Sequence, residues 1–165
     1  SFVEDYRKFT RVGTPEKQNI HLKAFIQEMR TLFQEELNQS NIKLEIDISS
    51  DTCIAADRVL LEQALINILR NAIDAISDKT DGKIIIHHEI NGGYDQIRVT
   101  DNGIGIPEKE LKEAFVPFFT TKKKGSGIGL SLARHILHAH GGTIHLESIV
   151  NERTSCALFL PSSDH

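Results

Sequence analysis

The chain has 165 residues, of which 39% are hydrophobic and 25% are charged. This length and composition predict one globular domain that can bury a core without a disulfide or metal staple. Nineteen Lys and Arg residues against 23 Asp and Glu residues give a net charge of −4, which argues against a nucleic-acid binder held by bulk positive charge. No apolar run approaches the roughly 18 residues of a membrane span, so we expect no membrane contact from this part of the protein.

Two features indicate the context of the chain. It begins at Ser1 without an initiator Met or a signal peptide, so we expect a fragment of a longer protein. Its two cysteines, Cys53 and Cys156, lie far apart and outside any C-x-x-C spacing. This favours a reducing, cytoplasmic location over a disulfide framework or a zinc knuckle.

Hydrophobic periodicity and turn residues predict helices and strands in mixed order. The predicted helices cover residues 1–11 (the end of a helix), 21–37, 57–76, 108–115 and 128–140. The predicted strands cover residues 41–49, 83–90, 96–100, 143–149 and 154–160. Asn91-Gly92-Gly93 predicts a hairpin turn, and Gly141-Gly142 predicts the end of the last helix. The hairpins imply antiparallel pairing, so the predicted fold class is α+β, a sheet with helices on one face.

The predicted helix at 57–76 carries a polar row that includes Asn67, Asn71 and Asp74, opposite an apolar stripe. Asp57 is a favourable N-cap for this helix. Asn67 and Asn71 are four residues apart, so their amides lie one turn apart on one face. Two amide oxygens in this arrangement suit Mg²⁺, which prefers oxygen ligands and keeps waters and substrate phosphates. The alternative is a solvated helix face, although Asn is a weak helix former and two in mid-helix call for a reason.

The segment Asp101-Asn102-Gly103-Ile104-Gly105-Ile106 follows the predicted strand at 96–100. One interpretation is an ordinary tight turn, because Asn-Gly favours hairpins. The other is a ligand-binding loop, in which the glycines let the backbone approach a flat ligand and Asp101 accepts a hydrogen bond from an exocyclic amine. An EF-hand is excluded, because Gly103 lies where an oxygen ligand is needed.

Gly125-Ser126-Gly127-Ile128-Gly129-Leu130 opens the predicted helix at 128–140, directly after Lys122-Lys123-Lys124. A glycine-rich backbone that leads into a helix N-terminus presents N–H groups and the positive end of the helix dipole to an anion. The lysines add charges suited to phosphate. The spacing matches neither a Rossmann fingerprint nor a P-loop. The alternative is a flexible loop with a solvated basic run.

The segment 115–122, F-V-P-F-F-T-T-K, contains three of the chain's eight Phe residues between the two glycine-containing segments. Aromatic residues in such a loop predict a lid whose rings dock when a ligand is bound. A loop held to the core by its aromatic rings is the alternative interpretation.

The order of these four segments resembles the N, G1, F and G2 boxes of the sensor histidine kinases, over roughly residues 40–160. The lead-in at residues 2–11 looks like the end of the second dimerisation helix of that family. Together with N-A-I-D-A at 71–75 and F-F-T-T-K at 118–122, it is most similar to the nitrogen-regulation type of these kinases.

The resemblance implies the Bergerat ATP-binding fold, a two-layer α/β sandwich with a mixed, mostly antiparallel sheet, which is shared with gyrase, Hsp90 and MutL. Residues 1–14 would be the end of the dimerisation helix and a linker, and residues 15–165 the ATP-binding catalytic domain. The implied reaction is transfer of the γ-phosphoryl group of ATP to a histidine, followed by its passage to an aspartate of a response regulator. The full-length protein would be a homodimer, with or without a membrane anchor, and this fragment a monomer.

The resemblance also implies roles for individual residues, with ATP and Mg²⁺ as cofactors. Asn71 would hold Mg²⁺ that bridges the phosphates, assisted by Asn67, and Asp101 would bind the adenine amino group. Asn67, Asn71 and Lys122 are the implied catalytic residues. The other implied nucleotide contacts are Asp74, Gly103, Gly105, Ile106, Phe119, Thr120, Thr121, Gly125, Ser126, Gly127, Ile128, Gly129 and Leu130.

The chain departs from the family pattern in several places. The phosphoacceptor motif is missing, because His88-Glu89 is the only His-acid dipeptide and no Pro follows it. We therefore expect that this fragment does not phosphorylate itself. Val116 stands where the F box commonly has an acidic residue, and Asp74 stands where many relatives have Lys.

Two other functions compete with this interpretation. An ATPase of the gyrase, Hsp90 or MutL type carries a Glu general base where Asn67 stands. An amide cannot take a proton from water, so we expect no efficient hydrolysis. The second is a degenerate kinase domain kept for protein contacts. The phosphate- and base-facing positions of the family pattern are all occupied here, which argues against it.

Overall fold

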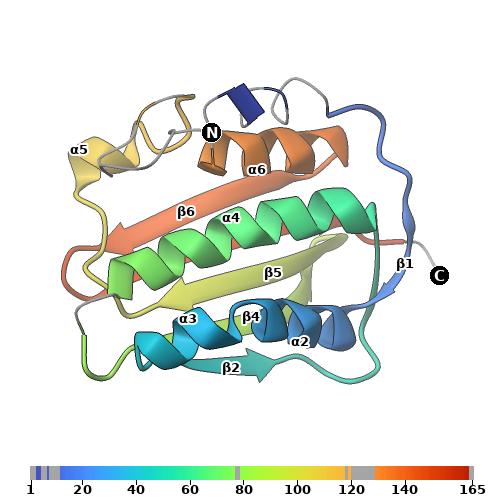
Figure 1. Ribbon diagram of the computed structural model, residues 1–165. Helices are drawn as coiled ribbons and strands as arrows, with labels where there is room; N and C mark the ends of the chain where they lie inside the picture. Colours follow the sequence, from blue (N-terminus) through green and yellow to red (C-terminus); the bar gives the residue numbers. More distant parts are fainter. Residues whose placement is uncertain are drawn as a thin grey trace.

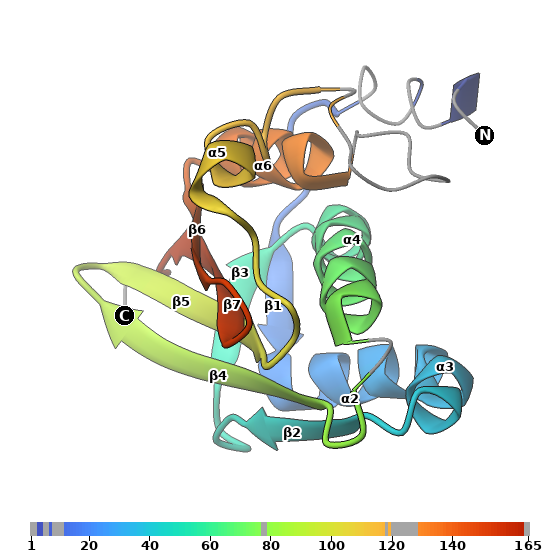
Figure 2. The same cartoon turned by 90° about the vertical axis from the view of Figure 1, so that its left-hand side faces the viewer.

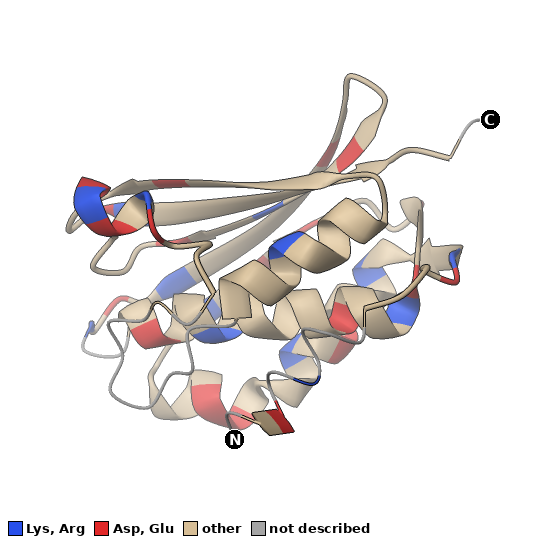
Figure 3. Ribbon diagram, turned by 90° about the horizontal axis from the view of Figure 1, so that it is seen from above, with Lys and Arg blue, Asp and Glu red and all other residues tan. Residues whose placement is uncertain are grey.

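The computed structural model of the chain describes residues 3, 4, 7, 12–76, 79–117, 119 and 129–163. It has two layers, a twisted sheet and a set of helices on one face of that sheet (Figures 2 and 3). The sheet contains β2 (Lys43–Asp47), β4 (Lys83–Asn91), β5 (Tyr94–Asp101), β7 (Arg153–Pro161) and β6 (Thr143–Ile149), in that spatial order. β2 runs parallel to β4, and the other neighbours are antiparallel. The predicted fold class is therefore confirmed.

Five helices are described: α2 (Leu22–Leu32), α3 (Gln34–Gln39), α4 (Arg58–Ile76), α5 (Glu108–Leu111) and α6 (Gly129–Ala139). α4 and α6 lie side by side across the sheet, with α2 and α3 on the other side of α4 (Figure 1). The predicted bounds of α4 and α6 agree with these within one residue. The prediction of one continuous helix over 21–37 is wrong, because the chain breaks at Phe33, whose ψ is 6°. Phe33, at this break, and Leu37, after it, are both buried in the core. The predicted helix at 108–115 is also too long, since α5 ends at Leu111 and turns follow it.

A small second sheet was not predicted. It pairs β1 (Gln18–His21) with β3 (Cys53–Ala56) in antiparallel fashion, with His21 opposite Cys53. Each strand has only four residues, so neither shows a readable alternation. β3 leads directly into α4, and this sheet therefore fixes the place where α4 begins. Cys53 and Cys156 are both free thiols.

Alternation along the strands places the core between the sheet and the helices. Ile84 and Ile86 of β4 are fully buried, and so is Ile97 of β5. In each strand, the residues next to these point to the opposite face of the sheet. Leu61 and Leu65 of α4 are also fully buried. Each such side chain contributes roughly 1.5–3 kcal/mol when it leaves water. This burial holds α4 against the sheet by its apolar stripe and turns its polar row away from it.

Two arginines of α4 also hold this helix to α2 and α3. Arg58 pairs with Glu28, and its guanidinium lies 4.9 Å from the centre of the Phe25 ring. Arg70 pairs with Glu36 at 3.1 Å and lies 5.2 Å from the centre of the Phe33 ring. The two contacts are three turns apart on α4. They resist rotation of the helix about its axis.

Some expectations fall outside these observations. The predicted helix end at residues 1–11 rests on a stretch in which only residues 3, 4 and 7 are described.

None of the described helices is both long enough and apolar enough to cross a bilayer.

Candidate functional site

The amide row of α4 forms one wall of the candidate site. Asn67 and Asn71 are partly buried and one turn apart, and Asp74 is exposed. Gly129, the first residue of α6, lies beside Asn67, because a Cβ built on Gly129 would be 3.7 Å from the Asn67 Cβ and 3.9 Å from its Oδ1. The N-terminus of α6 therefore starts next to the amide row; anion binding by this helix end stays a prediction.

Asp101, the last residue of β5, provides a buried carboxylate. It is 5% exposed, and its Oδ1 accepts a hydrogen bond from the Gly103 N–H at 2.8 Å. Burial raises the pKa of Asp101 to about 6, while the Gly103 N–H and the charge of Lys79 act in the opposite direction. Within the described part of the chain, Oδ2 has no assigned donor, so it remains available to accept from a ligand.

The loop 102–106 is clamped between α4 and the β6–β7 turn. The Ile104 N–H donates to the Ala75 carbonyl of α4 at 3.0 Å, and the Ile106 N–H donates to the Ser148 Oγ at 2.7 Å. A Cβ on Gly103 would lie 2.5 Å from the Ala75 oxygen. Gly105 has φ +75°, and a Cβ there would lie 2.5 Å from the Ile149 oxygen. We predicted that these glycines let the backbone approach a ligand; the contacts that exclude a side chain at both positions are made with the protein itself.

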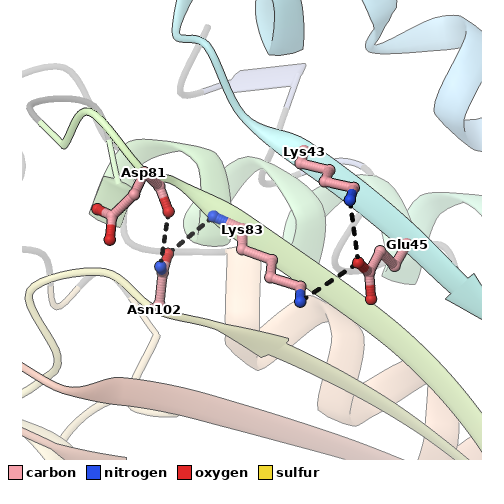
Figure 4. A network of polar contacts seen from close by, with 5 residues as sticks. All are labelled: Lys43, Glu45, Asp81, Lys83 and Asn102. Atoms are coloured by element: carbon pink, nitrogen blue, oxygen red, sulfur yellow. Dashed lines mark hydrogen bonds and ion pairs between the residues drawn. The ribbon is translucent and has the colours of Figure 1, made fainter.

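Asn102 anchors the same loop to β4 (Figure 4). Its Oδ1 accepts from the Lys83 N–H at 2.8 Å, and its Nδ2 donates to the Asp81 carbonyl at 2.9 Å. Lys83 extends the network by pairing with Glu45 of β2 at 3.2 Å, and this hydrogen bond holds the pKa of Glu45 below its usual value. Sequence reasoning missed this role of Asn102. No local signal was available, because the two backbone groups that Asn102 binds lie 19 and 21 residues away in the chain.

These parts line up along α4. Asn67 lies beside Gly129, and Ala75 lies beside Gly103, whose N–H binds the Asp101 carboxylate. Eight helical residues separate Asn67 from Ala75, which is about 12 Å along the axis. The site therefore suits an elongated ligand that offers a hydrogen-bond donor at one end and an anion at the other.

Of the remaining residues predicted to contact a nucleotide, three have described contacts and the others lie outside the described part of the chain. Ile106 is held by Ser148, and the Phe119 N–H donates to the Val116 carbonyl at 3.2 Å. Leu130 packs against the hydrophobic core. The other predicted contacts lie outside the described residues: Thr120, Thr121, Lys122, Gly125, Ser126, Gly127 and Ile128.

The donor set of the site limits which metal it could hold. Among the described residues, no group of three or more His, Cys, Asp or Glu side chains is arranged to bind a metal ion. The amide oxygens of Asn67 and Asn71 are neutral, hard donors one turn apart. They fit Mg²⁺ that arrives with phosphate oxygens, since that ion keeps most of its ligands from water and substrate.

Comparison with known proteins places this geometry in a family. Residues 56–164 match the family described as histidine kinase-, DNA gyrase B- and HSP90-like ATPase. The chain is 35% identical over 161 residues to the signal transduction histidine-protein kinase AtoS of Escherichia coli, which covers 96% of the chain and 26% of AtoS. The chain thus spans about a quarter of the length of that relative.

Solved structures agree with this match. The catalytic domain of the histidine kinase ThkA, in a nucleotide-free form, superimposes with a TM-score of 0.79 at 35% identity, over 89% of this chain and 96% of that one. A structure of ThkA in complex with the response regulator protein TrrA matches with a TM-score of 0.81 at 30% identity, over 98% of this chain and 46% of that one.

Proposed function

Because the chain belongs to the histidine kinase-, DNA gyrase B- and HSP90-like ATPase family, we propose that it is the ATP-binding catalytic domain of a sensor histidine kinase of the nitrogen-regulation type. One observation carries the proposal. The buried Asp101 carboxylate at the end of β5 and the Asn67–Asn71 amide pair of α4 both border the same helix, because the Gly103 N–H that binds Asp101 lies next to Ala75 of α4.

Asp101 binds the base in this proposal. Its Oδ1 is occupied by the Gly103 N–H, so Oδ2 accepts from the exocyclic amine of adenine. Guanine presents a carbonyl oxygen at the corresponding ring position, which would face the carboxylate acceptor to acceptor. An unpaired buried acceptor is costly, so the site discriminates against guanine.

Asn71, assisted by Asn67, holds Mg²⁺ that arrives with the phosphates. When bound, Mg²⁺ neutralises charge on the β- and γ-phosphoryl oxygens. The backbone N–H groups at the start of α6, at Gly129 and Leu130, bind phosphate oxygens. Lys122 and the neighbouring predicted contacts at 120–128 complete this end of the site.

The phosphoryl acceptor is a histidine outside this chain, on the dimerisation domain of the same protein. We assign residues 1–14 to the end of that domain's second helix and the linker, and residues 15–165 to the catalytic domain. The phosphoryl group then passes to an aspartate of a response regulator. The complex of the similar kinase ThkA with a response regulator supports such a partner. The full-length protein is a homodimer with this domain in the cytoplasm, and the isolated fragment is a monomer.

An ATPase of the same family is the second candidate, but Asn67 argues against it. The residue lies on α4 beside Gly129, where a general base would be needed near the phosphates. An amide has no basic lone pair for a water proton. Rapid steady-state release of inorganic phosphate by the isolated chain would favour this candidate instead.

The test is phosphoryl transfer in the full-length protein with γ-labelled ATP and Mg²⁺. We expect label that is stable to base and labile to acid, as for phosphohistidine, and no label on the isolated chain of 165 residues. Asn71→Ala should abolish the label, whereas Asn38→Ala, which removes an exposed Asn from α3, should not. Full labelling of the Asn71→Ala protein would contradict the proposal.

A further inference from the structure

The C-terminal end of α6 lies against the start of α4, far from the Asn67 contact. Here the Gly141 N–H donates to the His138 carbonyl at 3.0 Å, and the Gly142 N–H donates to the Leu137 carbonyl at 2.9 Å. With φ +79° at Gly141, this is a Schellman cap. His140 is the cap residue of the helix, so its backbone position is fixed by the motif.

The His140 side chain has a defined protonation state in this position. It is 2% exposed, with Nε2 at 3.0 Å from the Asp57 backbone nitrogen and Nδ1 at 2.8 Å from the Ile136 carbonyl oxygen. A backbone N–H can only donate, so Nε2 must accept and carry no proton. Nδ1 then carries the proton and donates to Ile136. The ring is therefore the neutral Nδ1–H tautomer.

Asp57 is the residue that starts α4. Its Oδ1 accepts from the Leu60 N–H at 3.1 Å, and its Oδ2 accepts from the Glu16 N–H at 2.9 Å. Burial opposes ionisation here, but these N–H groups outweigh it and lower the pKa of Asp57. Lys17 reaches the same junction, with its Nζ at 3.4 Å from the His140 carbonyl oxygen. His140 thus bridges the cap of one helix to the cap of the other.

The two helices are antiparallel and matched in length between their two contacts. Gly129 to His140 spans 11 residues of α6, or roughly 16 Å, and Asp57 to Asn67 spans 10 residues of α4, or about 15 Å. At the Asn67 end the two helices leave space for a methyl group, because a Cβ built on Gly129 would lie 3.7 Å from the Asn67 Cβ. The His140–Asp57 bond is a polar contact that ties the C-terminal end of α6 to the start of α4.

We propose that His140 is a positioning residue for nucleotide binding: by accepting the Asp57 N–H, it sets where the N-terminus of α6 lies relative to Asn67 and Asn71. This inference rests on the proposed function, because it concerns the same nucleotide. A sliding of α6 would move its first N–H groups away from the phosphates and leave the Asp101 end of the site unchanged.

The test compares His140→Asn with His140→Gln. An Asn side chain can still donate to Ile136 but is too short to reach the Asp57 N–H, whereas a Gln side chain can place an oxygen near the position of Nε2. Two controls accompany them. His138→Asn changes an exposed histidine of the same helix, and Leu37→Ala destabilises the core at α3, away from α6.

The readouts are the Kd for a non-hydrolysable ATP analogue with Mg²⁺, measured well below each variant's Tm, and the exchange rate of the Asp57 amide. We expect His140→Asn to weaken binding about 3- to 30-fold and to speed exchange at Asp57. His140→Gln should restore most of the affinity. Leu37→Ala should lower the Tm without changing the Kd, because a residue that only stabilises the fold does not alter affinity while the protein remains folded.

Two outcomes distinguish a failure of the proposed function from a failure of the role proposed for His140. If the unmodified chain does not bind the analogue, the proposed function fails, and this inference fails with it. If the unmodified chain binds and His140→Asn binds equally well while its Asp57 amide exchanges faster, this inference alone is overturned. Should His140→Asn not fold, imidazole ¹⁵N spectra of the unmodified chain still decide one premise, since a proton on Nε2 of His140 would contradict it.

Discussion

The loop after β5 and the start of α6 both border α4, but they meet it in different ways. A Cβ on Gly103 would lie 2.5 Å from the Ala75 oxygen, whereas a Cβ on Gly129 would lie 3.7 Å from its nearest neighbour at Asn67. The loop is also held by hydrogen bonds to Ala75 and to Ser148. The end of the site at Asp101, the proposed base end, is therefore fixed by the folded protein itself. The end at Asn67 and Gly129, the proposed phosphate end, has more space around Gly129 among the described residues, and we infer that His140 positions it from the far end of the helix pair.

The largest effect should come from Gly105→Ala, which adds a methyl group to the tightly packed loop after β5. The methyl group would overlap the Ile149 oxygen, and φ of +75° costs an L-residue further free energy. We expect a loss of about 2–5 kcal/mol in the free energy of unfolding, measured by urea denaturation. A change below 0.5 kcal/mol would show that the loop is not clamped as described.

A second effect concerns the free energy of unfolding of the chain, which depends on pH through Asp101. The pKa of Asp101 rises from its ordinary value of 3.8 to about 6 on folding. The folded state then binds this proton more tightly, so the contribution to stability is present below pH 3.8 and is lost as the pH rises through 6. Asp101→Asn should be more stable than the unmodified chain at pH 7.5 by up to about 3 kcal/mol, and the difference should vanish near pH 4. Urea denaturation at both pH values measures it, and a difference independent of pH would contradict the assignment.

The same substitution should have the opposite effect on ligand binding. In Asp101→Asn, an oxygen can still accept from Gly103, but an NH₂ group then faces the adenine amine, donor against donor. We expect at least a roughly 100-fold loss of affinity for an ATP analogue, by calorimetry. Asp95→Asn, a change to another buried carboxyl of β5, is the matched control. Retention of full affinity by Asp101→Asn would remove the carboxylate from the base site.

The phosphate end can be tested through its dependence on Mg²⁺. Asn71→Ala removes one of the two amide oxygens while keeping a good helix former in α4. The affinity gained on adding Mg²⁺ should fall at least tenfold, whereas the affinity in excess chelator should stay nearly unchanged. The measurement is a nucleotide titration with and without the ion, with Asn38→Ala beside it. An equal loss in both conditions would indicate disruption of the helix.

The smallest effect on stability is expected at Gly129, the first residue of α6. Gly129→Ala places a methyl group 3.7 Å from Asn67, an ordinary van der Waals separation. The free energy of unfolding should change by less than about 0.5 kcal/mol. A loss as large as that of Gly105→Ala would mean that the two ends are equally tight, and the contrast between them would be wrong.

Sequence patterns predicted the elements whose signals are local. The apolar stripe and Asp57 cap of α4, and the Gly92-Gly93 turn between β4 and β5, all lie within one segment of chain. The β1–β3 sheet was missed because its two four-residue strands lie more than 30 residues apart. The break at Phe33 was missed because Phe33 and Leu37 continue the helical spacing of apolar residues across it, so periodicity alone shows no interruption.

The same reasoning applies to the candidate site. Asp101, Asn67 and Asn71 carry side-chain chemistry that a motif displays, and the loop after Asp101 lies against the helix that carries the two Asn residues. Ser148 and His140 act on backbone groups 42 and 83 residues away in the chain. No local spacing encodes such a contact, so these supporting residues became visible only with the fold.

One titration tests whether this chain binds ATP through Asp101 and the Asn67–Asn71 pair. The isolated chain is titrated calorimetrically with a non-hydrolysable ATP analogue, with and without Mg²⁺, and then with the corresponding GTP analogue. We expect binding that requires Mg²⁺ for full affinity and strongly favours the adenine nucleotide. Absence of binding at millimolar nucleotide, or equal binding of the guanine nucleotide, would contradict it.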